Sequence, residues 1–167
     1  ILCAILLAAQ IMATPVVHIE RVPDNGIQPR LVSDVDGGVH LLYFKKTEDK
    51  KSGHLYHSKL DSQGKWSQIR QVSQAFTHND AIGKASMAVD VDKNPHVVWY
   101  VSNPSGYWYN RMIGDSFEPP RSLVSNNLKG VEAEASIASH ESQIAISWHA
   151  GDLRAESKRQ VYSLSSS

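Results

Sequence analysis

The sequence predicts an all-β fold built from repeated four-stranded antiparallel sheets, and three observations support this. Residues 34–44 (DVDGGVHLLYF) recur at 90–100 (DVDKNPHVVWY) without a gap, and a more divergent copy runs over 139–148. Within each copy, apolar residues alternate with polar ones or form short apolar runs, the pattern of β-strands. Beyond the first residues of the chain, no stretch has the 3.6-residue period of an amphipathic helix.

The composition limits the class of protein. The chain has 167 residues, of which 41% are hydrophobic and 20% charged, and its formal net charge is zero. These values are typical of a globular protein and exclude a disordered one. No nucleic-acid partner is expected, because binding to phosphates needs clustered Lys and Arg.

The N-terminal residues predict export. Residues 1–13 (ILCAILLAAQIMA) carry no charge and are too few to span a membrane, which takes about 20 apolar residues. They match the apolar part of a secretory signal, here incomplete, with a buried first helix or strand as the alternative. The lone cysteine, Cys3, lies inside this segment, so the mature chain has no thiol for a disulfide or a metal. We therefore expect a secreted or periplasmic protein without a membrane span, with residues 14–27 as a lead-in strand.

Each repeat predicts strands in a fixed order. Residues 87–91 alternate between larger apolar and smaller or polar side chains, and residues 96–101 form an apolar run expected of a strand covered on both faces. Turn sequences at 36–38 and 92–95 join two such strands into hairpins. Aromatic segments and a further turn follow in each unit. The predicted units are 28–73, 84–125 and 133–167, and the last has room for three strands.

Four strands in each repeat of this length are typical of a β-propeller blade. A small twisted sheet cannot bury both of its faces alone, and stacking sheets around an axis covers them. We expect about two complete blades and part of a third, from a ring of six or a similar number of blades. The remaining blades would belong to the full-length chain, and Tyr43, Trp99 and Trp148 are expected to pack between blades. A small β-sandwich is the alternative.

Residues 58–66 (SKLDSQGKW) resemble the Asp-box of the sialidase-type (BNR-repeat) propellers. The resemblance rests on Ser58, Asp61, Gly64 and Trp66, with Gly64 one position later than in the usual spacing, and it extends over residues 28–167. It implies that the box stabilises a hairpin turn. It also implies that the functional site lies on the opposite rim of the ring and that the partner is a glycan or polysaccharide.

Four residues are candidates for the site that this resemblance implies. Arg30 lies near the place of a family arginine that binds the sugar carboxylate, and Asp80 lies in the loop that carries the general acid. Such an acid needs a raised pKa. His78 and Tyr107 lie in loops of the same rim and are candidate substrate contacts. For Arg30 and Asp80 the alternative is an ordinary strand end and an ordinary loop carboxylate.

Three functions follow as hypotheses. The first is an exported sialidase-like propeller that acts on glycans and releases terminal acidic sugars by hydrolysis. The alternatives are a non-catalytic carbohydrate-binding propeller and a polysaccharide lyase of a related propeller family, the latter motivated by His78. No cofactor or metal is expected, because the pairs Asp34/Asp36 and Asp90/Asp92 bracket hairpin turns and are expected to stabilise them.

Overall fold

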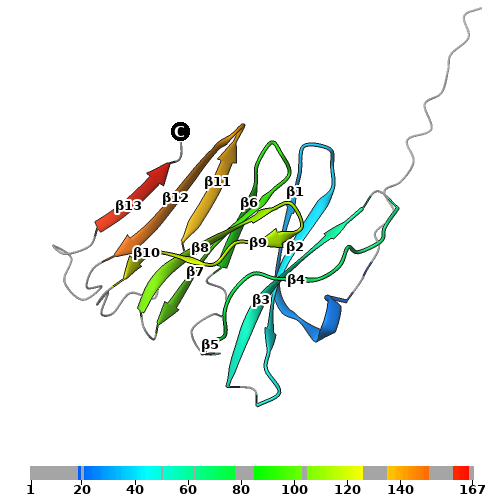
Figure 1. The fold of residues 1–167 in the computed structure, drawn as a ribbon, viewed down its shortest axis with the longest axis horizontal. Coiled ribbons are helices and arrows are strands. Elements are labelled where there is room, and N and C mark those ends of the chain that lie inside the picture. Colours follow the sequence, from blue (N-terminus) through cyan, green and yellow to red (C-terminus); the bar gives the residue numbers. More distant parts are fainter. Residues whose placement is uncertain are drawn as a thin grey trace, which may run out of the picture.

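The computed structural model describes residues 19, 21–49, 51–61, 63–77, 85–102, 105–125, 135–150 and 160–165. These residues form three antiparallel β-sheets that stand side by side in chain order, and a single 3-10 turn, Pro23–Asn25, precedes the first sheet (Figure 1). The predicted all-β class is confirmed. The predicted signal segment, residues 1–13, lies outside the described residues. Nowhere in the described part is there a helix long and apolar enough to cross a membrane.

Each sheet is built from strands that follow one another up and down. The first has the order β1 (Ile27–Ser33), β2 (Val39–Lys46), β3 (Ser52–Leu60), β4 (Arg70–Gln71), and β5 (Phe76–Thr77) also pairs with β3. The second has the order β6 (Ala85–Val89), β7 (Pro95–Ser102), β8 (Ser105–Ile113), β10 (Arg121–Ser125), with β9 (Ser116–Phe117) paired to β8. The third contains β11 (Ser136–His140), β12 (Gln143–Ala150) and β13 (Gln160–Ser165).

Three hairpin turns share one geometry. In each, an aspartate N–H donates to the carbonyl four residues later: Asp34 to Gly38 at 2.8 Å, Asp61 to Lys65 at 3.0 Å and Asp90 to Asn94 at 3.1 Å. The third residue after the aspartate has a positive φ, which favours glycine. These residues are Gly37 (81°), Gly64 (77°) and Lys93 (66°). The repeated sequence therefore folds into a repeated turn.

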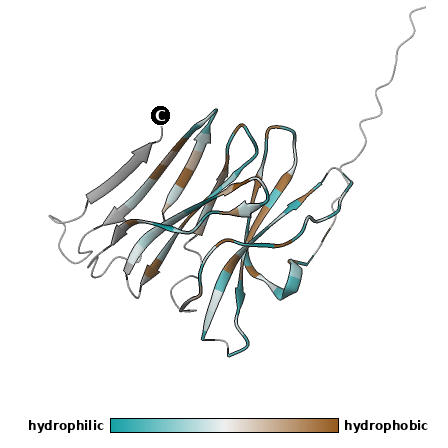
Figure 2. Ribbon diagram, in the orientation of Figure 1, coloured by the Kyte–Doolittle hydropathy of each residue, from teal (hydrophilic) through white to brown (hydrophobic). Residues whose placement is uncertain are grey.

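The first and second sheets pack through an apolar layer. Trp99 of β7 points into it, as predicted for an aromatic between sheets, and Asn110 Nδ2 donates to the Val72 carbonyl across the gap at 2.7 Å. Figure 2 shows the apolar segments along the strands that face a neighbouring sheet. The buried members of the layer are Leu42, Phe44, Leu55, Val72, Met87, Val97, Trp99 and Val101.

The second and third sheets pack in the same way. Trp148 of β12 points toward the second sheet, again as predicted, and Ser139 Oγ donates to the Val89 carbonyl at 2.6 Å. The buried members are Ala88, Val98, Tyr100, Tyr107, Ala135, Ile137, Ile144, Ile146 and Trp148. The remaining matched aromatic, Tyr43, lies in neither layer. It is buried beside Gly26 in the segment that precedes β1.

One expectation about local structure is wrong. Residues 21–26 of the lead-in strand predicted over 14–27 form a loop with a 3-10 turn, and Ile27 already belongs to β1. The loop forms because Pro23 has no N–H for a strand ladder and both Asp24 and Asn25 have positive φ.

The strand predicted from the alternation over 87–91 is confirmed as β6, which ends at Val89. Met87 and Ala88 face different apolar layers, so both are buried, because β6 lies between two sheets.

Candidate functional site

A cavity of about 550 Å³ lies between the second and third sheets, beside the hairpins β6–β7 and β11–β12. Its walls combine charged and polar groups with aliphatic side chains. It is lined by Asp90, Asp92, Asn94, His96, Tyr109, Arg111, Ile113, Arg121, Leu123, Ser142, Ile144 and Ile146. Volumes of about 300–1,000 Å³ are typical of small-molecule sites.

A hydrogen-bonded chain of three side chains forms one wall of the cavity. His96 Nε2 lies 3.0 Å from Asp90 Oδ2, and His96 Nδ1 lies 2.6 Å from the Tyr109 hydroxyl. The carboxylate of Asp90 can only accept, so Nε2 of His96 carries a proton, and in that tautomer Nδ1 accepts the Tyr109 hydroxyl proton. The Tyr109 oxygen can therefore only accept a further hydrogen bond.

The titratable ends of this chain keep their ordinary charge states at neutral pH. Burial by itself would raise the pKa of Asp90, but hydrogen bonds from His96 and Asn94 outweigh it and lower the pKa. Burial raises the pKa of Tyr109. Asp90 is thus an anion and Tyr109 a neutral phenol.

Two arginines stand beside this chain and share one carboxylate. Arg111 Nε donates to Glu118 Oε2 at 2.8 Å, and Arg121 Nη2 lies 3.3 Å from the same oxygen. This pairing raises the pKa of Arg111 and lowers the pKa of Glu118. Arg121 is 63% exposed at its side chain, so its guanidinium reaches solvent as well as the cavity.

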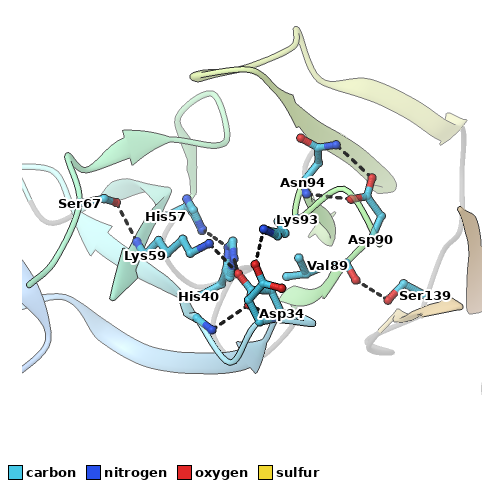
Figure 3. Close-up of polar contacts among 12 residues, drawn as sticks. Asp34, His40, His57, Lys59, Ser67, Val89, Asp90, Lys93, Asn94 and Ser139 are labelled. Carbon is cyan, nitrogen blue, oxygen red and sulfur yellow. Dashed lines mark hydrogen bonds and ion pairs between the residues drawn. The ribbon is translucent and has the colours of Figure 1, made fainter. Parts of the chain in front are cut away.

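The first gap, between the first and second sheets, carries an equivalent cluster (Figure 3). His40 Nε2 lies 3.3 Å from Asp34 Oδ2, His40 Nδ1 lies 2.9 Å from His57 Nε2, and Lys59 Nζ donates to Asp34 Oδ2 at 2.6 Å. The strand register makes the equivalence explicit. His40 faces Lys59 and Leu42 faces His57, just as His96 faces Arg111 and Val98 faces Tyr109.

This first cluster is buried except at Lys59, whose side chain is 33% exposed. The Lys59 ammonium, against the opposing effect of burial, holds the pKa of Asp34 well below its usual range. Burial lowers the pKa of His40, and it lowers the pKa of His57 to about 3. Among the described residues, His57 Nδ1 is a buried atom without a hydrogen-bond partner. Both imidazoles are therefore neutral at physiological pH.

Two small features close the first cluster. Phe117 of β9 contacts the His57 ring edge-on, with the ring centroids 5.7 Å apart. Gly38 leaves room for the ion pair, because a Cβ at this position would lie 2.6 Å from Lys59 Cε and 2.7 Å from Asp34 Oδ2. The position that Tyr109 takes in the second gap is occupied here by the buried imidazole of His57.

The predicted Asp-box forms a hairpin turn, as expected. Asp61 Oδ1 accepts the N–H groups of Gln63 and Lys65, both at 2.9 Å. Gly64 takes the positive φ of the turn. Ser58 is buried and donates from Oγ to the Ser67 carbonyl at 2.9 Å, and Trp66 bridges back to Leu60. These residues hold the turn and do not line the cavity.

The acidic pairs at the repeated hairpins also act in turns. Asp34 Oδ1 accepts the N–H groups of Asp36 and Gly38 at 3.0 and 2.7 Å, and Asp90 Oδ1 accepts that of Asn94 at 2.8 Å. Within the described part of the chain, no three His, Cys, Asp or Glu side chains group so that they could hold a metal ion.

Of the four predicted substrate and catalytic residues, the two that the structure describes, Arg30 and Tyr107, do not line the cavity. Tyr107, expected on a rim loop, is 0% exposed and packs between Tyr100 and Trp148, so its assignment as a substrate contact is wrong. Its place in β8, with neighbouring sheets on both sides, explains the burial. Arg30 lies exposed in β1 of the first sheet. His78 and Asp80 lie outside the described residues, and their roles stay predictions.

The sequence did not identify Tyr109 and Arg111 as cavity residues, because the repeated segments that align without a gap end before β8. The gapless copies at 34–44 and 90–100 pair Asp34 with Asp90 and His40 with His96. They stop before β8, which contributes Tyr109 and Arg111. The signal that would have found these two is the hairpin register, which places them opposite Val98 and His96.

Comparisons with known proteins give little further information. No protein-family profile matches the chain, and no curated sequence matches it. A solved structure, a fucose lectin from Kordia zhangzhouensis in complex with methyl-fucoside, is similar with a TM-score of 0.44 and 16% identity, over 82% of this chain and 92% of that chain. These values are too low to transfer functional residues.

Proposed function

We propose that this chain is part of a carbohydrate-binding β-propeller that holds a sugar between its second and third sheets without cleaving it. The observation that carries the proposal is the 550 Å³ cavity, whose walls combine hydrogen-bonding groups with aliphatic side chains. A monosaccharide needs both, because it presents hydroxyl groups around its ring and a C–H surface on its faces.

Each wall has a defined part in this proposal. The Tyr109 oxygen accepts from a sugar hydroxyl, because its own proton is donated to His96. Arg121 donates from the exposed part of its guanidinium. The side chains of Leu123 and Ile144 offer an apolar surface to a sugar face. The two sheets, each held by its own ladder, fix these groups in advance and reduce the entropy lost on binding.

The charge states favour binding over bond cleavage. Hydrolysis with paired carboxylates needs one that keeps a proton near neutral pH. Asp90 has a lowered pKa and is a poor proton donor. A lyase that uses tyrosine as a base needs a phenolate, and the raised pKa of Tyr109 opposes its formation.

The wider interpretation belongs to the same proposal. Three consecutive up-and-down sheets, with Trp99 and Trp148 between them, support an arrangement as blades. The Asp61 turn supports a relationship to the sialidase-type propellers. The uncharged residues 1–13 support export to a secreted or periplasmic location, and further blades of the full-length chain would complete the ring.

Titration of the full chain with methyl glycosides tests this function. Isothermal titration and saturation-transfer NMR would be run with the methyl glycosides of galactose, mannose, glucose and fucose. We expect at least one to bind. Arg121→Ala removes a cavity donor at an exposed position and should weaken that binding about tenfold, as loss of a hydrogen bond to a charged group would.

The matched control is Arg21→Ala, an exposed arginine in the segment that precedes the first sheet. It should leave the affinity unchanged. Release of methanol and a reducing sugar from any of these glycosides would contradict a purely binding role. Equal binding by wild type and Arg121→Ala would remove the cavity from the proposal.

A further inference from the structure

Resting on the proposed function, we infer that the cavity selects neutral sugars and rejects acidic ones. The two arginines at the cavity might suggest the opposite, since a guanidinium pair suits a carboxylate. The surroundings of the arginines favour neutral sugars instead, because the protein's own carboxylates, Glu118, Asp90 and Asp92, already lie near them.

The first argument is that both arginines are already paired. Glu118 sits behind them and binds Arg111 Nε at 2.8 Å and Arg121 Nη2 at 3.3 and 3.4 Å. A ligand carboxylate would have to compete with this internal carboxylate, which the chain holds in place through the Glu118 N–H bond to the Arg111 carbonyl at 3.0 Å. The N–H groups that this pairing leaves over can still donate to a hydroxyl oxygen.

The second argument is the sign of the remaining charge. Asp90 and Asp92 line the cavity, so with Glu118 three carboxylates face two guanidinium groups. Asp90 is held as an anion by three donors: the backbone N–H and side-chain amide of Asn94, and His96 Nε2. An anionic ligand would be repelled by this net negative charge, and because Arg111, Glu118 and Arg121 are 43%, 25% and 63% exposed, dissolved salt can screen the repulsion.

The third argument is the direction of the available hydrogen bonds. The Tyr109 hydroxyl donates to His96, so toward a ligand its oxygen is an acceptor. A sugar hydroxyl can donate to it, whereas an ionised carboxylate has no proton to give. Beside the Tyr109 oxygen, the CH₂OH group of a neutral sugar is thus favoured over the carboxylate of its acidic counterpart.

The experiment compares sugar pairs that differ at one carbon. The methyl glycosides of galactose and glucose carry CH₂OH where those of galacturonate and glucuronate carry a carboxylate. Titration of the full chain at pH 7 and fixed ionic strength should give an affinity for the neutral member at least about tenfold above that of its acidic partner. Raising the salt concentration should narrow this difference, because screening weakens the repulsion.

Variants that remove a carboxylate should relax the selection. Glu118→Gln releases the arginines, and Asp92→Asn reduces the negative charge without touching them. Each should raise the affinity for the acidic sugars about tenfold while changing the neutral affinity less. The control Glu48→Gln makes the same charge change as Glu118→Gln in the exposed β2–β3 hairpin and should have no effect.

The outcomes separate the two proposals. Binding of an acidic sugar as tight as, or tighter than, its neutral partner overturns the selection but leaves carbohydrate binding in place. Absence of binding by every neutral and acidic sugar overturns both. If Glu118→Gln lowers the unfolding midpoint, Asp92→Asn still decides the matter, and an unchanged acidic affinity in that variant overturns the selection.

Discussion

The gap between the first and second sheets and the gap between the second and third are built on equivalent residues but differ in what they enclose. Asp34 and Asp90 stabilise equivalent hairpin turns. His40 and His96 each contact the aspartate of their own turn through Nε2. In the first gap, the other ring nitrogen of His40 contacts the buried imidazole of His57, against which Phe117 packs. In the second gap, the other ring nitrogen of His96 contacts the Tyr109 hydroxyl, which lines the cavity.

The partner of the basic residue explains part of this difference. Lys59 and Arg111 occupy equivalent register positions. Ser67 and Glu118 are also equivalent, since each donates its N–H to the carbonyl of that basic residue. Glu118 draws Arg111 away from Asp90, whereas Lys59 turns inward to Asp34. The basic residue of one repeat thus pairs within the buried cluster, and that of the other pairs beside a cavity.

Lys59→Met should have the largest effect on stability. It removes the cation from Asp34, whose side chain is 0% exposed, and leaves a buried carboxylate that only His40 and turn N–H groups neutralise. We expect a loss of about 3 kcal/mol in the free energy of unfolding, measured with urea. The equivalent change Arg111→Met should cost much less, because its pair with Glu118 is partly exposed. Equal losses would contradict the comparison.

The second largest effect on stability should come from lowering the pH, because the first gap contains the buried histidines His40 and His57. His40 and His57 stay neutral in the folded protein, while the unfolded chain binds protons below the ordinary histidine pKa of 6.5. These histidines therefore do not change the free energy of unfolding above pH 6.5, and they lower it as the pH drops below 6.5. For His57 this loss continues until about pH 3, where the folded protein also binds the proton. His57 alone should contribute about 2 kcal/mol between pH 6.5 and pH 5.

His57→Gln tests the origin of this slope. The variant keeps a side-chain N–H for His40 but no longer titrates, so urea unfolding between pH 7 and pH 5 should show a smaller loss with acid. This window lies above the ordinary aspartate pKa of 3.8, so Asp34 does not contribute. The exposed His140→Gln is the control. An unchanged slope in His57→Gln would locate the acid sensitivity elsewhere.

Tyr109→Phe should have a smaller effect on stability and a clear effect on binding. It keeps the ring but leaves His96 Nδ1 without the 2.6 Å hydrogen bond, which should cost about 1 kcal/mol in the free energy of unfolding. Sugar affinity, measured by titration with the neutral methyl glycosides, should also fall. Full affinity in a correctly folded variant would show that the hydroxyl does not contact the ligand.

Asp61→Ala should have the smallest effect. It removes the acceptor for two backbone N–H groups in an exposed turn, and thermal unfolding should report a loss of about 1 kcal/mol or less. Asp61→Asn keeps an acceptor oxygen and should retain most of the stability. A loss of sugar binding in Asp61→Ala, without a change in stability, would contradict its purely structural role.

The sequence was sufficient for the all-β class, the hairpin turns and the aromatics between sheets. These features depend on local chemistry: the alternation over 87–91 and the apolar run over 96–101, the Asp61 carboxylate beside its own turn amides, and bulky rings at matched places such as Trp99 and Trp148. Each can be recognised within a few residues of chain. Tyr107 was assigned wrongly because its neighbours in space come from other strands and from the third sheet.

The cavity and its charges were decided by the tertiary structure. Tyr109 and Ile144 lie in different sheets, and both line the cavity because the second and third sheets pack together. The register of β7 and β8 places Arg111 beside His96 at the same cavity. The same register sets Lys59 on Asp34 in one gap and Arg111 on Glu118 in the other. The linear sequence specifies which side chains exist and which strands they occupy. Whether equivalent residues form a buried cluster or line a cavity depends on the volumes and charges of side chains that come into contact only after the sheets have packed.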